Sequence, residues 1–453
     1  MKKFPRNSEI EALSSWILDE SKKQGVSGAD VLYVQGRSTQ LSLMDGEVEE
    51  SLSGTSVGIG IRTIMSDGRQ GISYGNSMDR FSVKELLEWS IANCRNSEPE
   101  EGISLYSGKL VNDPSLFLED PRIYDITSED RMNYCLEMNN HAKSMDKRII
   151  SVRSAGWQDG YGSSFYCTTT GLSGWESATR ASCGVALLVS DGTSTEMGAY
   201  GESSRKLDEL DIRYSAAESV RKAISYLGAS TIKTGTYSVV LDQETTASLI
   251  DIVADLFCAP EIHKGRSMMK GQLGNKVASP CITLIDNGRI AWKSGSSSWD
   301  SEGVPTGETL LIENGIASSY LYNLQYAWKD GVQSTGNASR GLSSLPDVDT
   351  TNIILKPGTE SGEDIISSIK KGLYITEFMG LHTVDSISGN FSIGAKGLMI
   401  ENGELTHAVS GVTIASNLLD FIKRITVVGS DLKYFGSVAT PTVVVEGIVI
   451  AGD

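Results

Sequence analysis

The chain has 453 residues, of which 40% are hydrophobic and 21% are charged, and its formal net charge is −17 at pH 7. A globular protein of this length exceeds one compact core, so we expect two substantial domains. An acidic surface repels phosphate backbones, which argues against direct binding to DNA or RNA. No stretch approaches the roughly 18 apolar residues of a membrane span.

The first residues, MKKFPRNSEIEALSSW, start with two lysines but lack the apolar core of a signal peptide. We therefore expect a cytoplasmic protein without membrane contact. The six cysteines are scattered and form no CxxC pair, so we expect them to be reduced thiols in the core.

The first half of the chain alternates helices with strand-like runs. Ser8 and Glu11 predict a capping box for a first helix that Gly25 ends. Short alternating runs up to about residue 67, separated by glycines and Asp-Gly pairs, predict an antiparallel meander of short strands. The remaining pattern predicts further strands over 148–201 and helices over 83–94, 127–145 and 207–227.

The stretch GASTIKTGTY predicts a boundary between two domains, residues 1–228 and 229–453. After it, a short strand leads into a helix over 243–258, with Asp242 as its cap and an apolar stripe that packs on a sheet. The segments SGSSSWDSEG and DGVQSTGNASRG predict long loops, and Ser361 is expected to cap one more helix. Runs of strands interrupted by helices predict an α+β fold with largely antiparallel sheets.

Two glycine motifs in the first domain are weak signals of function. GTSVG at 54–58 fits the pattern of a hydrolase nucleophile, but Ser56 continues into an obvious strand and lacks the strand-to-helix turn that the chemistry needs. Gly58 and Gly60 could belong to a dinucleotide-binding loop, but no helix follows. Close packing against a strand is the better interpretation of these two glycines.

Histidine spacing gives no sign of a zinc helix. The four histidines are His141, His263, His382 and His407, and no two of them stand within one helical turn. The segment EIHKGRS gathers His263, Lys264 and Arg266, which could bind a carboxylate or phosphate, although a solvated loop is the commoner case.

Two carboxylates stand at positions i and i+4 on the helix over 243–258. Asp251 and Asp255 could bind a hard cation weakly, but a solvated polar face is the commoner arrangement.

Long segments of the second half resemble one known family. TNIILKPGTESGEDIISSIKKGLYITEFMG, followed by GNFSIGAKGLMIENGELTHAVSGVTIASNLLDFIKRITVVGSD, is similar to the C-terminal domain of the TldD/PmbA family, also labelled modulators of DNA gyrase. GTSVGIGIRTIMSDGRQGISYGN resembles the N-terminal domain of that family, and VQSTGNASRG adds to the match. The resemblance therefore extends over most of the chain.

The resemblance implies that this chain departs from the zinc-binding branch. TldD-type subunits carry HExxxH on a helix and a cysteine ligand near the carboxyl end. On that pattern Ile250 and Asp255 replace the histidines, Asp251 replaces the glutamate, and the tail around Gly436 and Ser437 lacks a cysteine. No shift of this register supplies the missing histidines, so the chain resembles the PmbA/TldE branch, with no metal ligands or catalytic residues of its own.

In that family, such subunits pair with a zinc-bearing TldD partner to form a protease for unfolded or extended peptides. We therefore expect a non-catalytic or auxiliary subunit that forms a dimer with a TldD-type paralogue or with itself, with zinc only in the partner. Whether the chain is itself an enzyme stays open. The substrate-cleft candidates, taken from position alone, are Asp251, Asp255, His263, Arg266 and His382.

Two other functions remain open. One is a homo-oligomeric module that binds unstructured peptides without cleaving them. The other is regulation of DNA gyrase through protein contacts, which rests only on the older family label.

Overall fold

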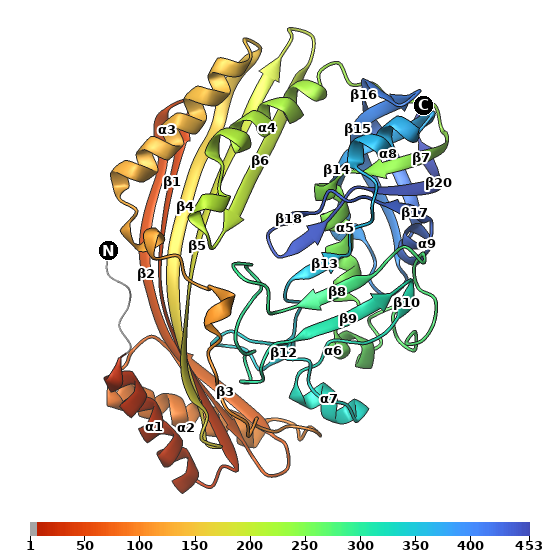
Figure 1. Ribbon diagram of the computed structural model, residues 1–453. Helices are drawn as coiled ribbons and strands as arrows, with labels where there is room; N and C mark the ends of the chain where they lie inside the picture. Colours follow the sequence, from red (N-terminus) through yellow and green to blue (C-terminus); the bar gives the residue numbers. More distant parts are fainter. Residues whose placement is uncertain (1–6) are drawn as a thin grey trace.

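The computed structural model describes residues 7–453. A long, curved sheet with its helices occupies one side of the molecule, and a more compact region made from the rest of the chain occupies the other (Figure 1). We call residues 7–228 the N-terminal half and residues 229–453 the C-terminal half. That these halves are separate domains stays a prediction.

One antiparallel sheet of six strands organises the N-terminal half, in the order β3-β2-β1-β4-β5-β6. Its strands are β1 (Gly28–Met44), β2 (Glu47–Ile64), β3 (Gln70–Gly75), β4 (Ile149–Thr168), β5 (Ser173–Ser190) and β6 (Thr195–Ser204). The prediction of short strands before residue 67 was wrong. Gly36 does not turn the chain but pairs in register with Ser56 and Gly162, so the short runs join into two long strands.

Two pairs of helices cover one face of this sheet at its opposite ends. The helices are α1 (Ser8–Lys23), α2 (Arg80–Asn96), α3 (Ser128–Met145) and α4 (Ile212–Ser225). In β1, Val31 belongs to the apolar cluster under α1 and α2, and Leu41 to the cluster under α3 and α4. Because alternate residues of a strand share a face, both helix pairs lie on the same side. The C-terminal half packs on the other side at Gly60 and also contacts α4, where Lys433 donates a hydrogen bond to Tyr214.

Two predicted helix starts in the N-terminal half need correction. The cap of α1 is Asn7, whose side chain accepts a hydrogen bond of 2.9 Å from the Glu9 amide, instead of a Ser8 capping box. The helix predicted from residue 207 begins at Ile212, because Asp211 caps it, and a separate 3-10 turn precedes it at Leu207–Glu209.

The C-terminal half contains two six-stranded sheets and a two-stranded ribbon of β11 and β12. The sheet orders are β10-β9-β8-β13-β19-β18 and β16-β15-β14-β7-β20-β17, in which only the pairs β13–β19 and β14–β7 are parallel. The strands are β7 (Gly235–Leu241), β8 (Leu284–Asn287), β9 (Glu308–Glu313), β10 (Ile316–Ala317), β11 (Ala338–Ser339), β12 (Asp347–Val348), β13 (Ile353–Leu355), β14 (Lys371–Met379), β15 (Asn390–Glu401), β16 (Glu404–Asn417), β17 (Ile425–Val428), β18 (Lys433–Phe435), β19 (Val438–Thr440) and β20 (Val443–Ala451). The predicted α+β class with largely antiparallel sheets is confirmed.

Helix α5 (Gln243–Asp255) contacts strands of both large sheets. Asp242 caps it as predicted, accepting a 2.7 Å hydrogen bond from the Thr245 amide. The helix ends three residues before the predicted Cys258, and a short helix with Pro260 in its first turn follows. The remaining helices of this half are α6 (Ala259–His263), α7 (Leu324–Asp330), α8 (Gly362–Ser368) and α9 (Leu418–Lys423).

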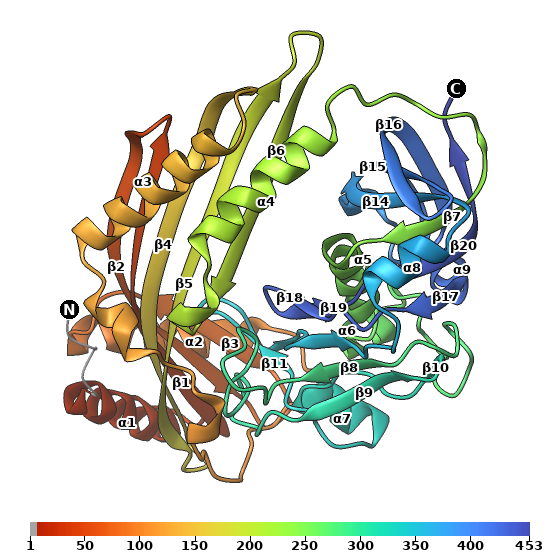
Figure 2. The ribbon, with the colours of Figure 1, turned by 45° about the horizontal axis from the view of Figure 1, so that its top comes forward.

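The two halves of the described chain do not share a buried apolar core. Each of the four apolar clusters among the described residues lies wholly within one half. The glycine- and serine-rich segments are irregular, as predicted, but side chains such as Ser298 and Glu302 are buried. Figure 2 shows the C-terminal half beside the long sheet and α4.

Two other predictions concern the thiols and the membrane. All six cysteines are free, and five of them are buried as expected, but Cys281 is exposed. Among residues 7–453, no helix is both long enough and apolar enough to cross a membrane.

Candidate functional site

A large cavity lies between the two halves of the chain. It has a volume of about 720 Å³, and β5, β6, α5 and β18 all contribute to its wall. A second hollow of about 500 Å³ on the long sheet shares Ser182, Tyr200 and Glu244 with it. We call the two together the central cavity, which has room for several residues of an extended peptide.

Helix α5 supplies one wall of the central cavity. Glu244, Ala247, Ser248 and Asp251 line it from successive turns of this helix. Partial removal of water, together with the negative charge of Asp349, raises the pKa of Asp251 above its ordinary value. This wall is therefore acidic and contains neither histidine nor cysteine.

Asp255 lies one turn beyond Asp251 on α5 but does not line the cavity. Its pKa is raised to about 6, first by loss of water and then by the charges of Asp251 and Asp349. The predicted solvated polar face is thus a set of carboxylates that repel one another near neutral pH.

The wall formed by β18 includes a lysine held by aromatic rings. The Lys433 ammonium of β18 lies 4.9 Å from the ring centre of Tyr200 and 4.5 Å from that of Tyr214. It also donates a 3.0 Å hydrogen bond to the Tyr214 hydroxyl on α4. Cation–π contacts of this kind fix the lysine against the N-terminal half.

A second lysine makes a similar connection. Lys293 forms a 3.1 Å ion pair with Glu209 of the N-terminal half and lies 4.5 Å from the ring centre of Tyr434. Sequence reasoning missed both lysines, because each is a lone charge in a segment without periodicity.

The remaining predicted cleft residues lie outside the central cavity. His263 lines a separate pocket of about 380 Å³, where its Nε2 is 2.8 Å from Asp330 Oδ1. Arg266 is exposed just beyond α6, and His382 is exposed on the 3-10 turn Leu381–Thr383. Of the five candidates, only Asp251 lines the central cavity.

The residues present do not fit a catalytic zinc ion. Ile250 stands where the TldD-type motif has a histidine. Its side chain is buried in the apolar core, with an exposure of 2%. Gly436, in the tail where a cysteine is expected, does line the central cavity but supplies no thiol. No group of three histidine, cysteine or acidic side chains within residues 7–453 is placed to hold a metal ion. Zinc sites in proteins need three or four such ligands around one point.

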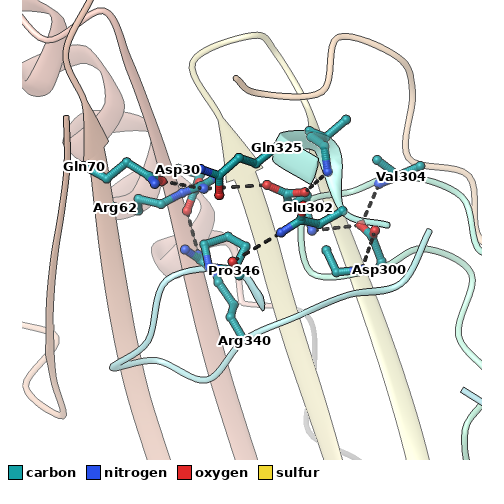
Figure 3. Close-up of polar contacts among 12 residues, drawn as sticks. Asp30, Arg62, Gln70, Asp300, Glu302, Val304, Gln325, Arg340 and Pro346 are labelled. Atoms are coloured by element: carbon teal, nitrogen blue, oxygen red, sulfur yellow. Dashed lines mark hydrogen bonds and ion pairs between the residues drawn. The ribbon is translucent and has the colours of Figure 1, made fainter. Parts of the chain in front are cut away.

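A buried cluster of four charges joins the halves away from the central cavity (Figure 3). We call Asp30, Arg62, Glu302 and Arg340 the junction cluster. Arg62 Nε is 2.6 Å from Asp30 Oδ2, and its Nη1 is 3.7 Å from Glu302 Oε1. Arg340 Nη2 is 2.6 Å from Asp30 Oδ1. Each half contributes one arginine and one carboxylate, so the cluster is neutral and paired across the junction.

The glycine motif of β2 packs beside this cluster. A Cβ atom on Gly60 would lie 2.6 Å from the backbone oxygen of Leu342, which belongs to the C-terminal half. These glycines therefore admit close packing, as predicted, although the neighbour is a loop of the other half and not a strand. Ser56 lies within β2, so the hydrolase turn is absent.

Models of one known protein family match most of the chain. Models of the PmbA/TldA metallopeptidases match in three consecutive parts. Domain 1 matches residues 29–94, the central domain matches residues 121–227, and the C-terminal domain matches residues 234–452.

Individual relatives are similar over more than nine tenths of their length. A metalloprotease of Methanothermobacter thermautotrophicus is 28% identical over 431 residues, which cover 94% of this chain and 92% of the relative. A homologue of metalloprotease PmbA from Haemophilus influenzae is 24% identical, with coverage of 99% and 97%.

Two solved structures have closely similar folds. A candidate modulator of a DNA gyrase from Thermotoga maritima superposes with a TM-score of 0.90 at 26% identity, covering 98% of this chain and 100% of that one. TldE from Thermococcus kodakarensis has a TM-score of 0.88 at 21% identity, with coverage of 98% and 100%. At 21% identity, the similarity to TldE shows a shared fold and nothing more.

Proposed function

Because the chain belongs to the PmbA/TldD metallopeptidase family, we propose that it is a non-catalytic subunit that pairs with a zinc-bearing paralogue. The observation that carries this proposal is the cavity-facing side of α5. It presents Ser248 and Asp251, while the neighbouring Ile250 is turned into the core. A zinc peptidase needs metal ligands at this place to activate water and polarise the peptide carbonyl.

The central cavity supports a role in holding the substrate of the partner. Its wall combines rings such as Trp292 and Tyr434 with charged groups that are partly paired already. Much of the floor of the adjoining hollow consists of small residues, including Gly156, Gly184 and Ala199. Such a floor lets the backbone of an extended peptide approach a sheet closely, whereas a folded protein exceeds a space of this size.

The proposal is tested by reconstitution with a TldD-type paralogue from the same genome. We expect the purified chain alone to leave an unfolded substrate such as reduced, alkylated casein intact. The mixture is expected to cleave that substrate faster than the paralogue alone, and gel filtration is expected to give one joint peak. Equal rates with and without this chain would contradict the proposal.

A matched pair of variants makes the test specific to the cavity. Asp251→Asn changes a charge on the cavity wall, whereas Asp420→Asn changes a charge on the distant helix α9. If the chain contributes to substrate binding, only the first variant should alter the KM of the mixture. A homo-oligomeric peptide-binding module predicts instead that the chain binds the unfolded substrate without any paralogue and never changes the rate.

A further inference from the structure

The contacts between the halves differ in character at opposite ends of the long sheet. Hydrogen bonds that link Asp113, Glu176 and Arg205 to residues 289–298 lie between those ends. Asp30 lies near the start of β1, and Gln40, which lines the central cavity, lies about ten residues further along. At about 3.3 Å per residue, the junction cluster and the cavity are therefore roughly 30 Å apart along the strand. The contacts between the halves differ in burial at these two places.

At the junction cluster the contact is dry. The side-chain exposures of Asp30, Arg62, Glu302 and Arg340 are 0%, 2%, 4% and 1%. The backbone of Leu342 packs directly on Gly60 beside them. Separating the halves here would leave buried charges without partners, which strongly raises the free energy of the separated state.

Along the central cavity the contact is polar and partly exposed. We call the following four contacts between the halves the polar seam: Lys222 with Glu244, Lys293 with Glu209, Lys433 with Tyr214, and Tyr226 with Thr376. In the first pair the side-chain exposures are 10% and 41%, and in the second they are 21% and 36%. Water and salt can replace such ion pairs at little cost. The Tyr226–Thr376 hydrogen bond is buried and insensitive to salt, but it joins two neutral hydroxyl groups, and a single neutral hydrogen bond contributes little to stability, so these contacts can break and re-form.

We propose that the central cavity opens along the polar seam, while the junction cluster acts as the fixed pivot. Opening at the seam would let an extended peptide enter from the side, without threading its end through a narrow entrance. The proposal concerns the isolated chain and holds whether or not a zinc-bearing paralogue binds. It explains why the two ends of one interface are built from such different contacts.

Spin-label distances measure this motion directly. In a Cys281→Ser background, which removes the exposed native thiol, one label pair spans the seam at Arg213→Cys on α4 and Glu363→Cys on α8. A second pair spans the junction-cluster end at Glu88→Cys on α2 and Val332→Cys after α7. Double electron–electron resonance then gives the distance distribution for each pair.

High salt and substitutions in the polar seam should both change the distance across the seam but not the distance at the junction cluster. Raising salt from about 0.01 M to about 1 M shortens the Debye length from about 30 Å to about 3 Å, which screens exposed ion pairs but not buried ones. The double variant Lys222→Met with Tyr226→Phe removes two seam contacts. The control Lys143→Met removes an exposed ion pair to Asp45 within the N-terminal half.

We expect a longer distance to gain population across the seam, both in high salt and in the double variant. The expected change in the ratio of open to closed molecules is about tenfold in the double variant, which corresponds to about 1.4 kcal/mol. The pair at the junction cluster and the Lys143→Met control should not change. A seam distance that stays constant in salt and in the double variant would overturn the proposal, as would equal lengthening at both ends.

Discussion

The junction cluster makes a quantitative prediction about stability. Arg62→Met removes one of two cations from a buried group of two arginines and two carboxylates, and leaves one negative charge uncompensated. Removing one partner of a buried ion pair costs about 3–5 kcal/mol. The methionine side chain retains part of the apolar volume of arginine, so lost packing contributes less than lost charge.

A second substitution should restore part of this loss. In Glu302→Gln with Arg62→Met, the remaining Asp30 and Arg340 keep their 2.6 Å ion pair and balance each other's charge. We therefore expect the double variant to be more stable than Arg62→Met alone, although it carries one more change. This non-additive outcome distinguishes a charge effect from a packing effect.

Urea denaturation followed by tryptophan fluorescence and circular dichroism measures both variants. Arg213→Met, which removes an exposed arginine of the same half paired with Glu137, serves as the control and should change stability by less than about 1 kcal/mol. The reasoning is refuted if Arg62→Met costs less than about 1 kcal/mol. It is also refuted if the double variant loses the sum of the two single losses.

Three further predictions test other features of the structure. Because the pKa of Asp255 is raised to about 6, its ionised form is disfavoured in the folded protein, and this residue makes stability fall as pH rises from about 4 to about 6. Asp255→Asn should therefore stabilise the protein at pH 8, by about 1 kcal/mol once solvent screening of this exposed group is allowed for, and should be neutral at pH 4. Gly60→Ala should cost about 1–3 kcal/mol in denaturant unfolding because its Cβ would lie 2.6 Å from the Leu342 oxygen, whereas Gly54→Ala, with no atom within 4 Å, should cost almost nothing. Ser361→Ala should lose about 1 kcal/mol in the same assay because it removes the cap of α8.

Local sequence signals predicted the helices well where the cap and the apolar stripe agreed. Asp242 and the stripe that includes Leu249 and Val253 placed α5 on its sheets, because both signals depend on residues within a few positions. Strand lengths were harder to predict. Glycines such as Gly36 turn the chain in many sheets, but here the residue stays extended between two neighbouring strands.

The candidate site could be predicted only in part. Asp251 reaches the central cavity because it lies on α5, the helix that the family resemblance identified. The junction cluster could not be predicted, because its four residues are far apart in the chain and single charges are usually exposed. The one available signal was Arg62 within the apolar run GIGIRTIM, where an inward-facing arginine needs a buried partner.

Zinc content of the purified chain tests the central claim most directly. The chain would be expressed without its paralogue, dialysed against zinc, freed of loosely bound metal on a chelating resin, and measured by plasma mass spectrometry. A non-catalytic subunit predicts far less than one zinc ion per chain and no cleavage of unfolded casein. One zinc ion per chain together with cleavage would contradict the account, and would require ligands that include Asp251, Asp255, His263 or His382.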